Sequence, residues 1–86
     1  MINEHWIMGI LIPERSKHAV EVQNLLTSFG CSIRTRLGLH DISNENEGNT
    51  GLILLDLSGD PAQWGLLEKK LQRFEGIIVK KMTFSL

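Results

Sequence analysis

Apolar residues fall into two kinds of run along this chain, and the two kinds alternate. His5–Ile12 and Thr50–Leu57 are nearly continuous apolar stretches, and their length is typical of buried strands rather than helices. Each is followed by a stretch in which apolar residues recur every three or four positions, the spacing of one helix face. The two helical stripes consist of Ala19, Val22, Leu25, Leu26 and Phe29, and of Trp64, Leu67, Leu71 and Phe74.

Residues with special backbone preferences mark where the helices begin and end. Ser16 is suited to cap the first helix with its hydroxyl group. Asp60 followed by Pro61 is a strong start signal for the second helix, with Asp as the cap and Pro at the first helical position. Gly30 and Gly76 fit the left-handed backbone position that often follows the last helical turn.

The remaining segments complete a repeated strand–helix–strand pattern. Ser32–Leu39 alternates between two faces, Asp41–Gly51 is polar and is typical of a loop, and Ile77–Phe84 is a final strand. The order predicts a single domain over residues 1–86 of the α+β class, a ferredoxin-like β-α-β-β-α-β sandwich. We expect an antiparallel four-stranded sheet with both helices on one face.

The two continuous strands are expected in the centre of this sheet, and both are apolar on both faces. A sheet with helices on one side needs only one apolar face. The other face must therefore meet something, and a second copy of the chain is the simplest candidate. We predict a homo-oligomer, dimer or tetramer, joined through the sheet face that carries Trp6, Met8 and Ile10 of the first strand and Leu52 and Leu54 of the third.

Charge and cysteine content narrow the range of partners. The net charge is -1, whereas a nucleic-acid binder normally carries a basic excess, so we expect no direct DNA binding by this chain. The single cysteine, Cys31, cannot form an internal disulfide, which favours a reducing, cytoplasmic location; we expect its side chain to be buried or half-buried. No apolar stretch reaches the length of a membrane span, so no membrane contact is expected.

One candidate ligand site lies on the second strand. Alternation places Arg34, Arg36, Gly38 and His40 on one face, which we predict to be the face away from the helices. Two guanidinium groups could hold a carboxylate or phosphate, and Gly38 would let a ligand approach the backbone. This pattern predicts a small anionic ligand near a subunit boundary. The alternative is that the charges only protect an edge strand against aggregation.

No other set of residues indicates chemistry. The spacing typical of a zinc site is absent from the candidate ligands His5, His18, His40 and Cys31, so we predict no metal site within one chain. A metal site assembled between subunits remains an alternative. No nucleophile is paired with a base. We therefore predict no catalytic residue and no cofactor, and we expect that the protein is not an enzyme.

Two segments carry a resemblance to a known family. Arg34–His40 (RTRLGLH) and Leu67–Lys81 (LEKKLQRFEGIIVKK), together with the overall length, resemble the iron-only hydrogenase system regulators. These are small ACT-like domains, similar also to the C-terminal domain of the nickel-responsive repressor. The resemblance implies an oligomeric, ligand-sensing or assembly module with a regulatory role. Two alternatives stay open: a protein–protein interaction module without a small ligand, and a metal-responsive sensor with histidines at the subunit interface.

Overall fold

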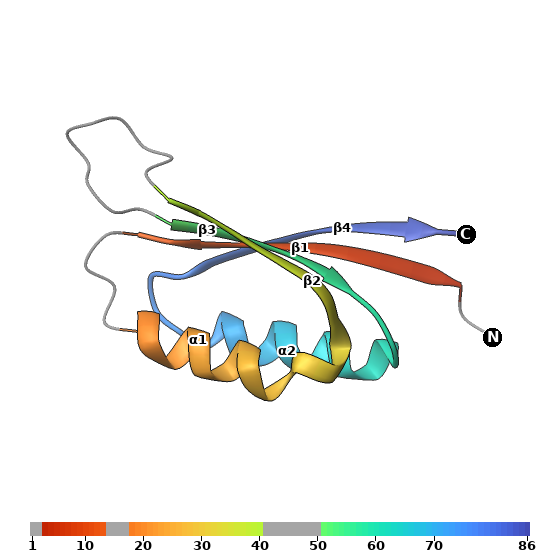
Figure 1. Ribbon diagram of the computed structural model, residues 1–86, viewed down its shortest axis with the longest axis horizontal. Helices are drawn as coiled ribbons and strands as arrows, with labels where there is room; N and C mark the ends of the chain where they lie inside the picture. Colours follow the sequence, from red (N-terminus) through yellow and green to blue (C-terminus); the bar gives the residue numbers. More distant parts are fainter. Residues whose placement is uncertain (1–2, 14–17, 41–50) are drawn as a thin grey trace.

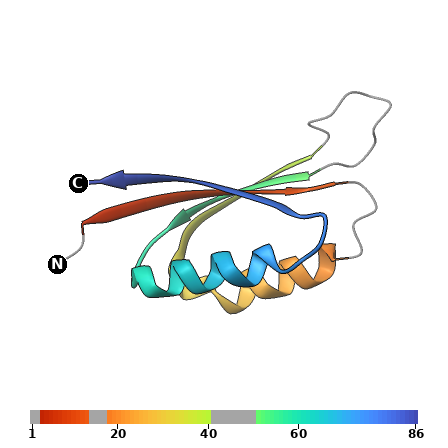
Figure 2. The ribbon, with the colours of Figure 1, turned by 180° about the vertical axis from the view of Figure 1, so that it is seen from behind.

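The computed structural model describes residues 3–13, 18–40 and 51–86, and these form one sheet and one helical layer. The elements in chain order are β1 (Glu4–Ile12), α1 (Ala19–Ser28), a short 3-10 helix (Gly30–Ser32), β2 (Ile33–His40), β3 (Gly51–Leu57), α2 (Pro61–Gln72) and β4 (Ile78–Ser85). The strand order across the sheet is β2-β3-β1-β4, and every neighbouring pair is antiparallel. Both helices cover the same face (Figures 1 and 2). The predicted fold class, order and central strands are confirmed.

The hydrophobic core lies between the sheet and the two helices. Both helical stripes contribute to it, as do alternate residues of β1 and β3, because every second side chain of a strand points to the same face. The buried apolar residues are Met8, Ile10, Ile12, Val22, Leu26, Ile53, Leu55, Leu57, Trp64, Leu67, Leu71 and Ile77. The indole N–H of Trp64 donates to the backbone carbonyl of Ser58 at 2.8 Å, so this large side chain is buried without leaving its polar atom unpaired.

The placement of three predicted interface residues on the uncovered face is wrong. The β1–β3 register pairs Met8 with Leu55 and Ile10 with Ile53, so these side chains share the helix-covered face, where Met8 and Ile10 are fully buried. Trp6 also lies on that side, with its ring 5.6 Å from that of Trp64. The reason for the error is that β1 is apolar on both faces, and its sequence cannot tell which face the helices cover.

Leu52 and Leu54 do lie on the uncovered face, as predicted. They pair with Leu11 and Gly9 of β1 and with Leu39 and Leu37 of β2. Residues directly opposite each other in a ladder point to the same face. We call the sheet surface away from the helices the open face; it is built from Leu52, Leu54 and their cross-strand neighbours.

A β-bulge on β2 reverses the alternation that the sequence predicts. Ile33 pairs with Leu57, and the next paired residue is Thr35, which lies opposite Asp56. Arg34 is therefore the extra residue, since a bulge sets two residues of one strand against one of its partner. Beyond the bulge, Arg36 pairs with the buried Leu55. Arg36 and alternate residues after it thus face the helices, contrary to our prediction.

The helix start signals are confirmed where the structure describes them. The Asp60 side chain accepts a hydrogen bond from the backbone N–H of Ala62 at 2.9 Å, with Pro61 at the first helical position. The predicted cap Ser16 and the predicted loop up to residue 50 lie outside the described residues. No helix in the described ranges is long and apolar enough to cross a bilayer.

The two predicted helix-ending glycines behave differently. Gly76 has a φ angle of 85°, the left-handed conformation that glycine adopts without steric cost, and it turns the chain into β4. Gly30 does not have positive φ; it begins the 3-10 helix that connects α1 to β2. The prediction for Gly30 is therefore wrong. Cys31, in the same short helix, is exposed rather than buried.

Candidate functional site

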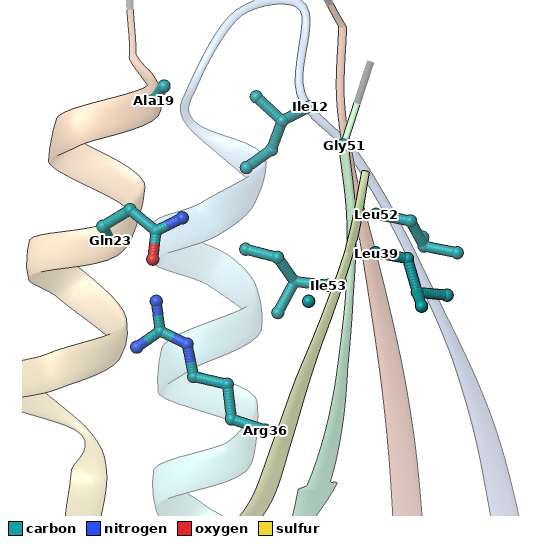
Figure 3. A pocket seen from close by; sticks show the side chains of 9 residues that line it. Ile12, Ala19, Gln23, Arg36, Leu39, Gly51, Leu52 and Ile53 are labelled. Atoms are coloured by element: carbon teal, nitrogen blue, oxygen red, sulfur yellow. The ribbon is translucent and has the colours of Figure 1, made fainter. Parts of the chain in front are cut away.

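A cavity of about 350 Å³ lies between α1 and the edge strand β2, next to β1 and β3 (Figure 3). It opens where the helical layer meets the outer strand of the sheet. We call it the Arg36 pocket. Its lining residues are Ile12 of β1, Ala19 and Gln23 of α1, Arg36, Gly38 and Leu39 of β2, and Gly51, Leu52 and Ile53 of β3.

The local sequence explains why this space is open. The bulge turns Arg36 and Gly38 toward the helix side, where Gly38 pairs with Ile53. A Cβ atom placed on Gly38 would meet nothing within 4 Å, so the missing side chain leaves room beside the backbone. Ile12 and Ile53, which are nearly fully buried, form an apolar part of the wall. The pocket therefore combines apolar contact surface with accessible strand backbone.

Two polar side chains converge on this space. Figure 3 shows the Arg36 guanidinium group extending from β2 toward α1, and the Gln23 amide extending from α1 toward it. Within the part of the chain that the structure describes, Arg36 has no ion pair or side-chain hydrogen bond. A guanidinium group offers several donors in a fixed plane that match a carboxylate or phosphate. The pocket can therefore accept an anionic group beside an apolar one.

Arg34 has a different environment, on the open face. Its Nε and Nη2 atoms donate to the two carboxylate oxygens of Asp56 at 3.0 and 3.3 Å, and Nε2 of His5 lies 2.6 Å from one of these oxygens. The hydrogen bond from Arg34 is the largest reason why the pKa of Asp56 lies below its usual value; partial burial opposes it, and His5 lowers it further. Arg34 is thus paired within its own chain.

The predicted site residues therefore do not form one group. Arg36 and Gly38 lie together in the pocket, Arg34 lies on the opposite face of the sheet, and the shared placement on the open face is wrong. The backbone of His40 pairs with Gly51, and its side chain lies outside the described part of the structure. That Arg36 and Gly38 bind a ligand stays a prediction.

Gln23 is a polar side chain of the pocket that the sequence did not indicate. It is one polar residue on the exposed side of a helix, with no motif around it, and only the packing of α1 beside β2 brings it near Arg36. Among the described residues, no group of three or more His, Cys, Asp or Glu side chains is placed to hold a metal ion. His18, at the start of α1, lies 2.8 Å from the carboxylate of Glu21.

Comparison with solved structures finds the same fold in other small proteins. The chain has the ferredoxin-like fold of PII-like signalling proteins. A putative PII-like signalling protein of Thermus thermophilus, TTHA0516, is 8% identical with a TM-score of 0.61, covering 99% of this chain and 91% of that one. The PII-like nitrogen regulatory protein CPII of Thiomonas intermedia, bound to ADP, AMP and bicarbonate, is 14% identical with a TM-score of 0.53, covering 100% and 92%.

A further solved structure is more similar in sequence. The uncharacterised protein TM1266 of Thermotoga maritima is 28% identical, with a TM-score of 0.79, and the match covers 96% of this chain and 100% of that one. No family model and no curated protein matches the chain. The two chains therefore share the architecture over essentially their whole length.

Proposed function

We propose that the chain is a non-enzymatic regulatory module that binds a small anionic ligand in the Arg36 pocket. The observation that carries this proposal is a guanidinium group, without a carboxylate partner among the described residues, that is directed into a partly apolar pocket on a small domain. A guanidinium group in this pocket forms its strongest hydrogen bonds with an anion that binds to it directly. The ADP, AMP and bicarbonate bound to CPII are all anions, which supports the same ligand class.

The size and lining of the pocket suggest what the ligand looks like. At about 350 Å³ the cavity lies near the lower end of the range for small-molecule sites, roughly 300 to 1,000 Å³. We expect a metabolite whose charged group meets Arg36 and the Gln23 amide. Its less polar part would then contact Ile12 and Ile53.

Isothermal titration calorimetry with ADP, AMP and bicarbonate tests the proposal. The decisive variant is Gly38→Val, which fills open space in the pocket and places a β-branched residue in a strand, where it is well tolerated. Thr35→Val is the matched control, since Thr35 is exposed on the other face of the same strand. We expect binding of at least one anion by the native chain and the control, and about tenfold weaker binding by Gly38→Val.

Equal affinity in Gly38→Val would show that the ligand binds elsewhere on the chain. Absence of binding by all three anions would favour the second candidate function, a protein–protein interaction module without a small ligand. The observation that favours this second candidate is the apolar open face, on which Leu37 and Met82 are half exposed. A module of this kind would show association with a protein but no heat of binding with the anions.

The regulated process rests on the sequence resemblance alone. The segments Arg34–His40 and Leu67–Lys81 resemble iron-only hydrogenase system regulators, and we propose this system as the process that the module serves. Cells lacking the chain should then show altered hydrogenase activity or hydrogenase protein level. Unchanged activity and level would contradict this assignment without affecting the ligand site.

A further inference from the structure

The open face is an apolar surface that no described helix or strand covers (Figures 1 and 2). Its most exposed apolar side chains are Leu37 of β2 and Ile78, Met82 and Phe84 of β4, which are between 45% and 56% exposed. The cross-strand register places them on one face with half-buried neighbours from the two central strands. The neighbours are Ile7, Leu11, Leu52 and Leu54.

We infer that this face pairs two copies of the chain, sheet against sheet, and that a hollow at Gly9 receives a side chain of the partner copy. The inference is independent of the Arg36 pocket, which lies on the helix side of the sheet. It also moves the predicted subunit contact from Trp6, Met8 and Ile10 to the odd-numbered residues of β1.

The area of the face fits a pair of copies. The four half-exposed side chains and their four half-buried neighbours present on the order of 500 Å² of surface, so a face-to-face pair would bury about 1,000 Å² in total. A buried area of about 1,000 Å² is the minimum for a biological interface. An apolar patch of about 500 Å² is in the upper part of the range, roughly 300 to 600 Å², of the largest patch on a typical monomer, and such patches are often functional. Two twisted sheets can pack through such faces with their side chains interdigitated.

The charges on the face are compatible with burial against an identical surface. Asp56 is already paired with Arg34 and His5 of its own chain, so covering the cluster leaves no unpaired carboxylate, which would be costly. The other charged residue that the described ladders place on this face is Lys80. It lies on the edge strand β4, from which a long side chain can reach solvent while its stem stays covered. Among the described residues, no strong charge of one sign is left that would call for a differently charged partner.

The shape of the face is also self-complementary. A hollow of about 180 Å³ lies at Gly9, bordered by Ile7, Leu54, Lys80 and Met82. Gly9 has no side chain to fill it, while Met82 beside it is 56% exposed. In a two-fold pair the same patch of each copy forms the contact. Met82 of each copy can then enter the hollow at Gly9 of the other copy. The face therefore carries both halves of the contact.

Analytical ultracentrifugation of the full chain tests the inference, using two variants of the face. Gly9→Val fills the hollow; its Cβ would meet Leu54 at 3.6 Å, an ordinary contact. Met82→Lys puts a charge on the face at a position exposed enough to leave the monomer fold intact. Leu66→Lys, 43% exposed on α2, is the matched control. Circular dichroism and thermal unfolding check that each variant folds.

The native chain and Leu66→Lys should have twice the 9.7 kDa mass of one chain, or a larger even multiple, at micromolar concentration. The dissociation constants of Gly9→Val and Met82→Lys should rise at least tenfold, with ADP binding unchanged from the native chain. If Gly9→Val fails to fold, Met82→Lys alone decides the question. A native chain that stays monomeric, or an oligomer that both face variants leave intact, would overturn the inference.

Discussion

Replacing Arg36 and Arg34 separately by methionine should separate ligand binding from fold stability. The two arginines are two positions apart on β2, yet one faces the pocket and the other contacts Asp56 on the open face. Methionine keeps most of the apolar stem and removes the charge, so each variant loses the same chemistry. A difference between the variants in ligand affinity or in stability therefore comes from the face of the sheet on which the lost charge lay.

The magnitudes follow from what each guanidinium group contacts. A hydrogen bond to a charged group contributes about 1.5 to 3 kcal/mol, so Arg36→Met should weaken binding of an anion by roughly 10- to 100-fold. The unfolding free energy of Arg36→Met without ligand should change by less than about 0.5 kcal/mol, as is usual for an exposed side chain, because Arg36 has no partner among the described residues. Arg34→Met removes two contacts to Asp56 and should lower the stability of the ligand-free chain at neutral pH.

Thermal unfolding with and without the anion that binds best, for example ADP, measures both effects. At a ligand concentration of about 100 times the dissociation constant, binding adds about 2.7 kcal/mol to stability. A tenfold weaker Arg36→Met would gain only about 1.4 kcal/mol, which reduces the ligand-induced rise in Tm by roughly 5 to 10 °C for a domain of this size. Arg34→Met should start from a lower Tm but keep the full rise. The opposite pattern, or equal losses in both variants, would refute the reasoning.

Three further predictions concern the fold. Leu55→Ala, at a fully buried position in the central strand β3, should lower the unfolding free energy by about 2 to 5 kcal/mol in urea denaturation; a loss below about 1 kcal/mol, as for an exposed site, would contradict the packing described. Asp60→Ala should lower the unfolding free energy by about 1 kcal/mol in the same assay, because the hydrogen bond that the Ala62 N–H donates to the Asp60 side chain is lost. Asp60→Asn should keep most of the stability, since Asn caps helices about as well as Asp. Because the pKa of Asp56 is lowered in the folded state, its stabilising contribution is present at neutral pH and is lost as pH falls below about 3.9. Asp56→Asn should therefore show a flatter acid limb in stability against pH, and an unchanged limb would show that the carboxylate contributes nothing.

The order of elements could be predicted from the sequence because each signal is local. Two apolar runs, two helical stripes, the Asp60 cap and Gly76 each act within a few residues, and the structure confirms them. The central position of β1 and β3 follows from the topology, because in a β-α-β-β-α-β chain with right-handed crossovers the first and third strands lie in the middle of the sheet.

The faces of the strands could not be predicted, and the reason is physical. Both sides of β1 are apolar, so Met8 and Ile7 look equivalent until the position of the helices is known. On β2 the alternation of arginines is regular in the sequence, but the bulge at Arg34 inserts one residue and reverses it. The pocket was missed for a related cause, since Gln23 and Arg36 meet only through the packing of α1 beside β2.

The bulge at Arg34 has a consequence for how related chains should be aligned. Because this residue is an extra member of the ladder, removing it would leave Ile33 opposite Leu57 and Thr35 opposite Asp56, with no change to either face. A single-residue gap is therefore tolerated at this point, whereas a gap further along β2 would turn every later side chain to the other side. In a relative that lacks the extra residue, the arginine equivalent to Arg36 would lie two positions after the residue equivalent to Ile33, which faces the helices. Plain alternation would then assign its face correctly.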